Sequence, residues 1–189
     1  MFLFGHLGIT LAATHTFEKV ILSQGKKKLA GLIDYRLVLL GSMLPDIIDK
    51  PLGGLIFKAT LGNGRIYAHT LIFLLLLGGT GIFFWVKDRR PGMLALAGGS
   101  LIHHILDGMW RFPGTYLWPF SGWSFPKGDP EGWLWQWLSS LATNPWVYIP
   151  EIVGGVILFC FFGKLANQKR VRIFITTGKT EPQSECINN

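Results

Sequence analysis

Two histidines and an aspartate lie inside an apolar run, "GGSLIHHILDGMW" at residues 98–110. His103 and Asp107 are four residues apart, so on a helix they share one face. An imidazole nitrogen and a carboxylate oxygen at this spacing form a compact pair that suits zinc or a similar divalent ion. The simpler alternative is a buried His–Asp hydrogen bond. His104 points about 100° away, and we expect it to serve packing or a helix interface.

The composition of the chain is that of a membrane protein. Of its 189 residues, 49% are hydrophobic and 15% are charged, whereas a soluble domain has about 25% charged residues. A helix that crosses a membrane needs about 20 mostly apolar residues. Five segments approach this length, at about 2–22, 36–57, 66–86, 91–110 and 146–163. We therefore predict an all-α, polytopic membrane helix bundle with about four to five membrane helices.

The second segment contains "LPDIIDKP", and Pro45 disfavours helical backbone at the residue before it. We expect this segment to be a broken or re-entrant helix, which a membrane protein tolerates only where it lines a cavity. The helical domain is predicted to cover residues 1–166. The polar residues 167–189 are predicted to form a loosely ordered tail.

Basic residues are distributed unevenly among the connections. Thirteen of the 18 Lys and Arg residues lie on one set of alternate connections, mainly at "KKK" 26–28, at "KDRR" 87–90 and after Lys164. Because cytoplasmic loops carry the excess of Lys and Arg, we expect a multi-pass protein of the cell (inner) membrane with these connections in the cytoplasm. The charge is confined to short clusters, which argues against a nucleic-acid partner, since that would need a continuous basic face.

This topology brings further candidate ligands to the extracytoplasmic side. The set consists of His6, Asp46, Asp49, His69, His103 and Asp107. Singly, each has a simpler explanation, such as a lone buried His, an Asp that caps a turn or an interfacial His in an aromatic belt. Four segments that each bring a metal-type ligand to one side favour a shared site. His15, nine residues after His6, falls on the opposite helix face and is left out.

Four motifs resemble those of a known family. They read "GHLGITLA", "GSMLPDIIDK", "RIYAHTL" and "GGSLIHHILDGMWRFPGTYLWPF". Over about residues 1–125 the chain resembles the YdjM-like inner-membrane metal-dependent hydrolases of bacteria and archaea, the LexA-regulated hydrolases, which are distantly related to zinc-dependent phospholipase C and the S1/P1-type nucleases. The resemblance implies an all-α fold and phosphoester chemistry. It also implies metal ligands at His6, Asp46, His69, His103 and Asp107.

The chain departs from the family pattern at several positions. The usual "PDxD" is lengthened to "PDIID", which leaves the role of Asp49 open. The usual "HRxxTH" reads "GRIYAH", with Gly64 in place of the first His and Ala68 in place of Thr. No His follows Asp107, so a third zinc site like that of the phospholipases cannot form.

The ligand count predicts one or two divalent ions, with zinc as the expected metal. One ion would be held by Asp46, His69, His103 and Asp107, and Asp107 could bridge to a second ion held by His6. A water activated by the metal would attack the phosphoester. Asp49 and Arg65 are the candidate catalytic residues. Arg65, four residues before His69, could bind a phosphate with two hydrogen bonds or could be a snorkelling interfacial Arg.

Six of the eight Trp residues lie between positions 118 and 146. Within this loop, "DPEGWLWQWLSSLATNP" predicts a helix that Asp129 caps, with Pro130 at its first position. Trp133 and Trp137 would share one apolar stripe, as in an amphipathic helix that lies in the headgroup plane. Such a helix could present lipid to the site or only anchor the protein.

The leading hypothesis is a membrane-embedded metal-dependent hydrolase of a phosphoester, either a phospholipid or an isoprenoid phosphate, with membrane lipids as partners. Ion or proton transporters also use intramembrane His and Asp. Transporters, however, show inverted repeats and paired broken helices, and this chain has no repeat and one predicted break. A structural or regulatory membrane protein with a vestigial metal site is the third possibility, supported by Gly64 and Ala68.

Overall fold

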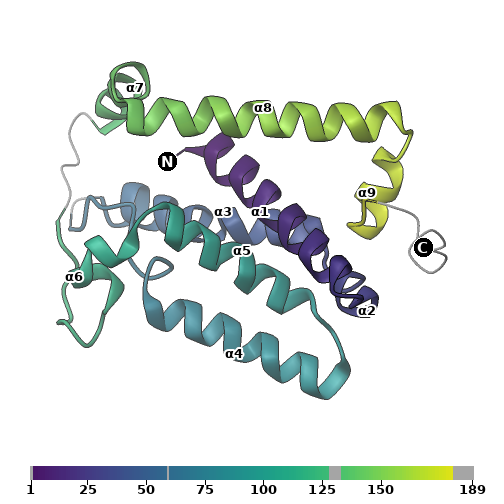
Figure 1. Ribbon diagram of the computed structural model, residues 1–189. Coiled ribbons are helices and arrows are strands. Elements are labelled where there is room, and N and C mark those ends of the chain that lie inside the picture. The colour runs from purple at the N-terminus through teal and green to yellow at the C-terminus, as the bar shows by residue number, and fades with distance from the viewer. Residues whose placement is uncertain (1, 59, 128–132, 181–189) are drawn as a thin grey trace.

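The computed structural model describes residues 2–58, 60–127 and 133–180, and every regular element among them is a helix (Figure 1). The predicted all-α class is confirmed. Five long helices make up the bundle: α1 (Leu3–Ser23), α3 (Tyr35–Pro51), α4 (Leu71–Asp88), α5 (Gly92–Leu106) and α8 (Pro145–Asn167). The short helices are α2 (Lys27–Ala30), the π-helix η1 (Leu52–Ile56), the 3-10 helix η2 (Met109–Arg111), α6 (Pro113–Tyr116), α7 (Trp133–Thr143) and α9 (Val171–Thr177).

The long helices pack in the order α8, α1, α3, α5, α4, and each contacts the next (Figure 1). Small residues allow two of these contacts to be close. A Cβ on Gly8 would overlap the backbone of Gly154 in α8, and a Cβ on Gly99 would overlap the α3 backbone at Val38. Such small-residue contacts are typical of helix packing in membranes.

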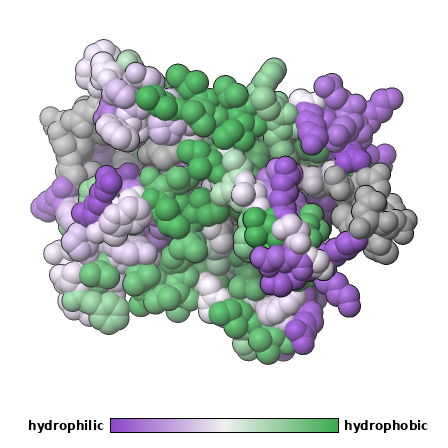
Figure 2. Space-filling view, viewed as in Figure 1, coloured by the Kyte–Doolittle hydropathy of each residue, from purple (hydrophilic) through white to green (hydrophobic). Residues whose placement is uncertain are grey.

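In the part of the chain that the structure describes, two helices are long and apolar enough to cross a membrane, α4 and α8. The helix α5 is also apolar but shorter, with 15 residues. Figure 2 shows a hydrophobic surface across the middle of the molecule, between two ends that are more hydrophilic. Leu75 of α4 and Phe159 of α8 are 64% and 80% exposed, although both are large and apolar. The total of four to five spans stays a prediction.

The predicted break in the second segment is wrong, because α3 continues without interruption through Pro45. Pro45 has no N–H to donate to the carbonyl of Gly41, four residues earlier. The hydroxyl of Ser100 in α5 donates to that carbonyl instead, at 2.9 Å. Since the freed carbonyl has a partner on a neighbouring helix, proline is tolerated inside α3.

A packed helix occupies part of the segment for which a loosely ordered tail was expected. Phe174 of α9 is buried against Leu11, Tyr35 and Leu165. The backbone N–H of Tyr35 also donates to the carbonyl of Gly178, at 2.9 Å. The bundle therefore extends beyond the predicted boundary at residue 166, and residues 181–189 lie outside the described part of the chain.

The connections gather at two opposite ends of the bundle (Figure 1). One end carries α2, the turn between α4 and α5, and α9, and it holds the basic clusters at 26–28 and 87–90. The other end carries residues 52–70, α6 and α7. The helix α7 forms within the predicted range, and its Trp135 is 74% exposed. The predicted cap at Asp129 and the side chains of Trp133 and Trp137 lie outside what the structure describes.

Candidate metal centre

The five predicted ligands meet at the end of the bundle that carries α6 and α7. We call them the His/Asp cluster: His6 of α1, Asp46 of α3, His69 before α4, His103 of α5, and Asp107 at the C-terminus of α5. All five side chains are buried, and the three imidazoles are fully so. Residues that are up to 101 positions apart in sequence thus form one polar centre inside an apolar bundle.

The Nε2 atom of His69 lies at the middle of the cluster. It is 3.2 Å from Nε2 of His103, 3.7 Å from Oδ1 of Asp46 and 3.9 Å from Oδ2 of Asp107. Nε2 of His103 lies 4.0 Å from each of these two carboxylate oxygens. Nε2 of His6 lies 3.2 Å from Oδ1 of Asp107, and its ring stacks on that of His103.

The opposite nitrogen of each imidazole has a fixed partner. Nδ1 of His6 donates to the carbonyl of Phe2 at 2.7 Å, and Nδ1 of His103 donates to the carbonyl of Ser42 at 2.6 Å. Nδ1 of His69 donates to Asp49 at 2.7 Å. A carbonyl can only accept, so in a neutral ring the proton is on Nδ1 and Nε2 carries a lone pair. Three lone pairs therefore face the carboxylates of the cluster.

This arrangement fits a cation. Two imidazole lone pairs 3.2 Å apart repel each other unless a proton or a metal ion lies between them. In addition, Nε2 of His6 is buried and has no hydrogen bond to another residue that the structure describes. Two sets of three ligand atoms lie within 4.8 Å of one another, namely His6, Asp46 and His103, and His69, His103 and Asp107. The donor set of imidazole nitrogen and carboxylate oxygen is one that zinc accepts.

Asp49 lies beside the cluster and faces the segment before α4. It is fully buried. Its Oδ2 accepts hydrogen bonds from the backbone N–H groups of Ile66 and His69, and its Oδ1 accepts one from the N–H of Ala68. With the bond from Nδ1 of His69, the two oxygens accept four hydrogen bonds in all. Asp49 thus fixes both the loop and the ring orientation of His69, as carboxylates behind metal-ligating histidines do.

Among the described residues, two basic side chains pair with carboxylates of the cluster. Arg65 donates from Nε and Nη2 to Oδ2 of Asp107, at 2.9 and 2.8 Å. Lys50 donates to Oδ2 of Asp46 at 2.6 Å. The Arg65 side chain is 38% exposed and its guanidinium lies over the ring of Phe112. Arg65 therefore reaches from the cluster to the surface.

The two remaining histidines lie outside the cluster. Nε2 of His104 donates to the carbonyl of Ala68 at 3.1 Å, and its ring stacks on His69. His104 therefore supports the segment before α4, in agreement with the packing role expected for it. His15 contacts the hydroxyl of Tyr35 at 3.2 Å and is 39% exposed.

The sequence reasoning missed Glu151 of α8. Its carboxylate accepts hydrogen bonds from the N–H groups of Phe2 and Phe4, at 2.6 and 2.9 Å. It thereby satisfies free N–H groups at the start of α1 and favours the positive end of that helix. Because the carbonyl of Phe2 also holds His6, Glu151 supports the cluster from a distance. The signal in the sequence that could have identified it is the single carboxylate in the apolar stretch "WVYIPEIVGG".

The fold and the site define an all-helical membrane protein with a buried His/Asp cluster. The model of the YdjM inner membrane protein family matches residues 1–173, so the chain belongs to this family and is an inner membrane protein. Comparisons with curated proteins and with solved structures gave no match.

Proposed function

We propose that the protein is a membrane-embedded, metal-dependent hydrolase of a phosphoester. The observation that carries this proposal is the pair of facing Nε2 atoms of His69 and His103, 3.2 Å apart, with both Nδ1 atoms already used as donors. In four-coordinate zinc sites the ligand nitrogens lie about 2.0–2.1 Å from the ion, which puts neighbouring ligand atoms about 3.3 Å apart. The observed separation is close to this value.

The geometry of the ligand atoms suits one ion. Nε2 of His69, Nε2 of His103, Oδ1 of Asp46 and Oδ2 of Asp107 lie close enough together to share it. Four ligand atoms are the usual number for zinc. His69, His103, Asp46 and Asp107 would hold the ion, and His6 would complete or adjust its ligand set.

When bound, a divalent ion supplies an activated water near neutral pH and stabilises negative charge on a phosphoryl oxygen. The side chains of the chain have distinct roles around it. Asp49 is a positioning residue that keeps Nε2 of His69 directed into the cluster. Arg65 holds Asp107 in place, and its exposed position allows it to bind a phosphate oxygen at the edge of the site.

The surroundings of the cluster favour a lipid phosphoester as substrate. Large aromatic side chains at the same end of the molecule are exposed, including Phe120 at 88%, Trp123 at 81% and Trp146 at 88%. Aromatic residues of this kind are enriched at the level of lipid headgroups. A phospholipid or an isoprenoid phosphate would bring its phosphate to this depth while its chains stay in the membrane.

The direct test is elemental analysis of the purified protein with a phosphate-release screen. His103→Ala and Asp107→Ala should each remove the metal and abolish hydrolysis. His104→Ala is the matched control, because Nε2 of His104 donates to the carbonyl of Ala68 and His104 belongs to neither set of ligand atoms, and it should keep the metal. Melting temperatures of all three variants check the fold. If all three retain full zinc content, the proposed ligand set is wrong.

A structural or regulatory protein with a vestigial site is the second candidate, and one observation favours it. Asp46 and Asp107 are each paired with a basic side chain already, so the cluster can persist without metal. This candidate predicts purified protein without bound metal and no phosphate release. The transporter alternative is weaker, because α3 is not broken at Pro45.

A further inference from the structure

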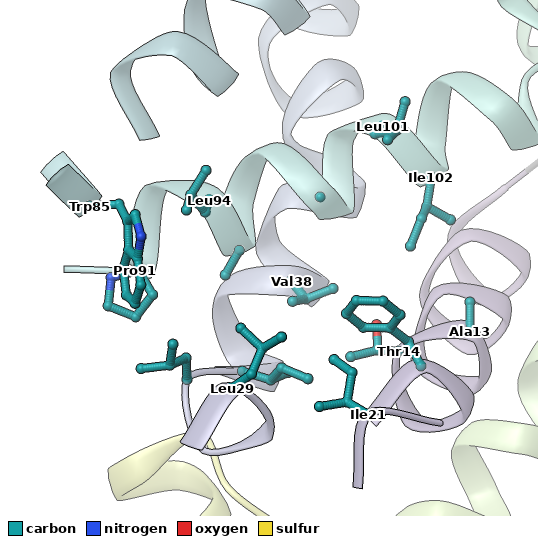
Figure 3. A pocket seen from close by; sticks show the side chains of 15 residues that line it. Ala13, Thr14, Ile21, Leu29, Val38, Trp85, Pro91, Leu94, Leu101 and Ile102 are labelled. Carbon is teal, nitrogen blue, oxygen red and sulfur yellow. The ribbon is translucent and has the colours of Figure 1, made fainter. Parts of the chain in front are cut away.

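A groove of about 600 Å³ lies between α1, α2, α3 and α5 (Figure 3). Its walls are apolar apart from the hydroxyl of Thr14 and the indole N–H of Trp85. None of the residues of the His/Asp cluster lines it. The groove is open to the outside of the bundle, since its lining residues Phe17, Leu29 and Leu101 are 59%, 46% and 47% exposed.

One end of the groove is basic. Leu29 follows Lys27 and Lys28 in sequence, and Pro91 follows Arg89 and Arg90. The guanidinium of Arg89 lies 5.8 Å above the ring of Trp85, which lines the groove. An indole paired with Arg is typical of the level where lipid chains meet their headgroups. The apolar walls therefore end at a rim that attracts anions.

We propose that this groove binds one acyl chain of an anionic phospholipid, with the phosphate of the headgroup at the basic rim. The volume is in the range of about 300–1,000 Å³ that is common for small-molecule sites. Walls with so few polar atoms would not retain water, and in an inner membrane protein the surrounding solvent is lipid. The positive rim selects a negatively charged headgroup. The site is separate from the proposed hydrolase centre and does not depend on it.

Gly98 allows the groove to be filled without disturbing the fold. A Cβ at Gly98 has no neighbour within 4 Å, although the residue lines the groove. Gly98→Leu should therefore place a side chain where the acyl chain lies. Gly79→Leu on α4 is the matched control, because a Cβ there is equally unhindered and the position lies outside the groove.

The test is native mass spectrometry of the purified protein with phosphatidylglycerol or phosphatidylcholine of identical chains. The wild type and Gly79→Leu should retain phosphatidylglycerol at least about tenfold better than phosphatidylcholine. Gly98→Leu should lose this bound lipid while keeping the metal content and melting temperature of Gly79→Leu. The double variant Arg89→Asn, Arg90→Gln should reduce this preference for phosphatidylglycerol, because it removes two of the four basic side chains beside the groove. Asn suits position 89 because it tolerates the positive φ of 56° there.

Three results would overturn the proposal. The first is equal retention of the two lipids by the wild type. The second is equal lipid retention by Gly98→Leu and Gly79→Leu. The third is a dimer of the chain that Gly98→Leu dissociates, which would assign the groove to a second copy. If the purified protein contains no metal but still binds phosphatidylglycerol, and Gly98→Leu removes this lipid, the proposed hydrolase is refuted and the lipid site is not.

Discussion

At the scale of single residues, Asp46 has two oxygens in different environments. Oδ2 accepts a hydrogen bond from Lys50 at 2.6 Å, and Oδ1 faces the Nε2 atoms of His69 and His103. An Asp that only capped a turn could be replaced by Asn, which caps nearly as well. A metal ligand could not, because Asn lacks the negative charge. The same substitution therefore separates the two roles.

We predict that Asp46→Asn abolishes hydrolysis and lowers the affinity for the metal by more than about tenfold. Loss of a carboxylate that only supports a metal ligand already lowers the affinity by about 10- to 100-fold. The measurements are metal content after dialysis and the rate of phosphate release. Asp88→Asn, at the exposed end of α4, is the control and should behave as wild type. Activity of Asp46→Asn within a few-fold of wild type would exclude Asp46 as a ligand.

Residue types and spacing were enough to predict which side chains form the cluster, but not what each contacts. The i, i+4 rule places His103 and Asp107 on one face, and the structure brings them to the same centre. The same rule brings Lys50 within reach of Asp46 on α3. Arg65 and Asp107 lie on different segments, so spacing gives no information on their contact. Asp49 was a candidate catalytic residue, and its hydrogen bonds to residues 66–69 depend on a loop whose path the sequence does not define.

At the scale of the elements, Asp34 determines where α3 begins. Its carboxylate accepts hydrogen bonds from the N–H groups of Arg36 and Leu37 and pairs with the Arg36 side chain. Burial alone would raise the pKa of Asp34, but the hydrogen bonds and charge of Arg36 outweigh burial and hold the pKa below its ordinary value. The ionised carboxylate therefore stabilises the folded state.

We predict that Asp34→Ala lowers the free energy of unfolding by about 1 kcal/mol at neutral pH, the usual cost of a lost cap. Asp34→Asn keeps the cap and should lose less. Because the folded pKa is below the unfolded value of about 3.9, the ionic contribution is complete above about pH 4 and disappears as the pH falls through the folded pKa. Thermal unfolding at several pH values measures this. A difference between wild type and Asp34→Asn that persists in strong acid would contradict it.

The helices themselves were more predictable than their ends and interruptions. All five apolar segments contain a long helix, because apolar length is a local property. The continuity of α3 through Pro45 depends on Ser100, which is 55 residues away in sequence. The packing of α9 depends likewise on Leu11 and Tyr35. Such compensation between distant segments is invisible to local rules.

The helix α7 supports a prediction about the substrate. Trp135 and Leu138 are 74% and 52% exposed, as expected of a helix whose apolar side chains enter the headgroup region. The double variant Trp135→Ser, Leu138→Ser should lower turnover of a vesicle-bound phospholipid several-fold and leave turnover of a small soluble phosphodiester unchanged. Equal losses on both substrates would mean that α7 supports the fold and does not engage lipid.

At the scale of the whole molecule, the cluster depends on chain segments from both ends of the sequence. Glu151 of α8 accepts a hydrogen bond from the N–H of Phe2, the N-cap residue of α1, and the carbonyl of Phe2 holds His6. Ser42 and Gly41 of α3 accept hydrogen bonds from His103 and Ser100 of α5. The cluster therefore forms only when the bundle is complete, and its placement at one end sets which side of the membrane it faces.

The last prediction concerns this sidedness. The turn between α4 and α5 is basic, and the His/Asp cluster lies at the opposite end of both helices (Figure 1). At about 1.5 Å per residue, the 15 residues of α5 cover about 22 Å of a hydrocarbon core about 30 Å thick. Since basic loops stay in the cytoplasm, the cluster should face the extracytoplasmic side, beside α6 and α7.

Single cysteines test the sidedness in intact cells, in a variant that lacks Cys160 and Cys186. Lys127→Cys marks the end with the cluster, and Arg90→Cys marks the basic turn, where both side chains are exposed. A membrane-impermeant thiol reagent should label position 127 and spare position 90 until the cells are opened. The reverse pattern would place the cluster in the cytoplasm. Labelling of both positions in intact cells would show that α4 and α5 do not cross the membrane as a pair of spans.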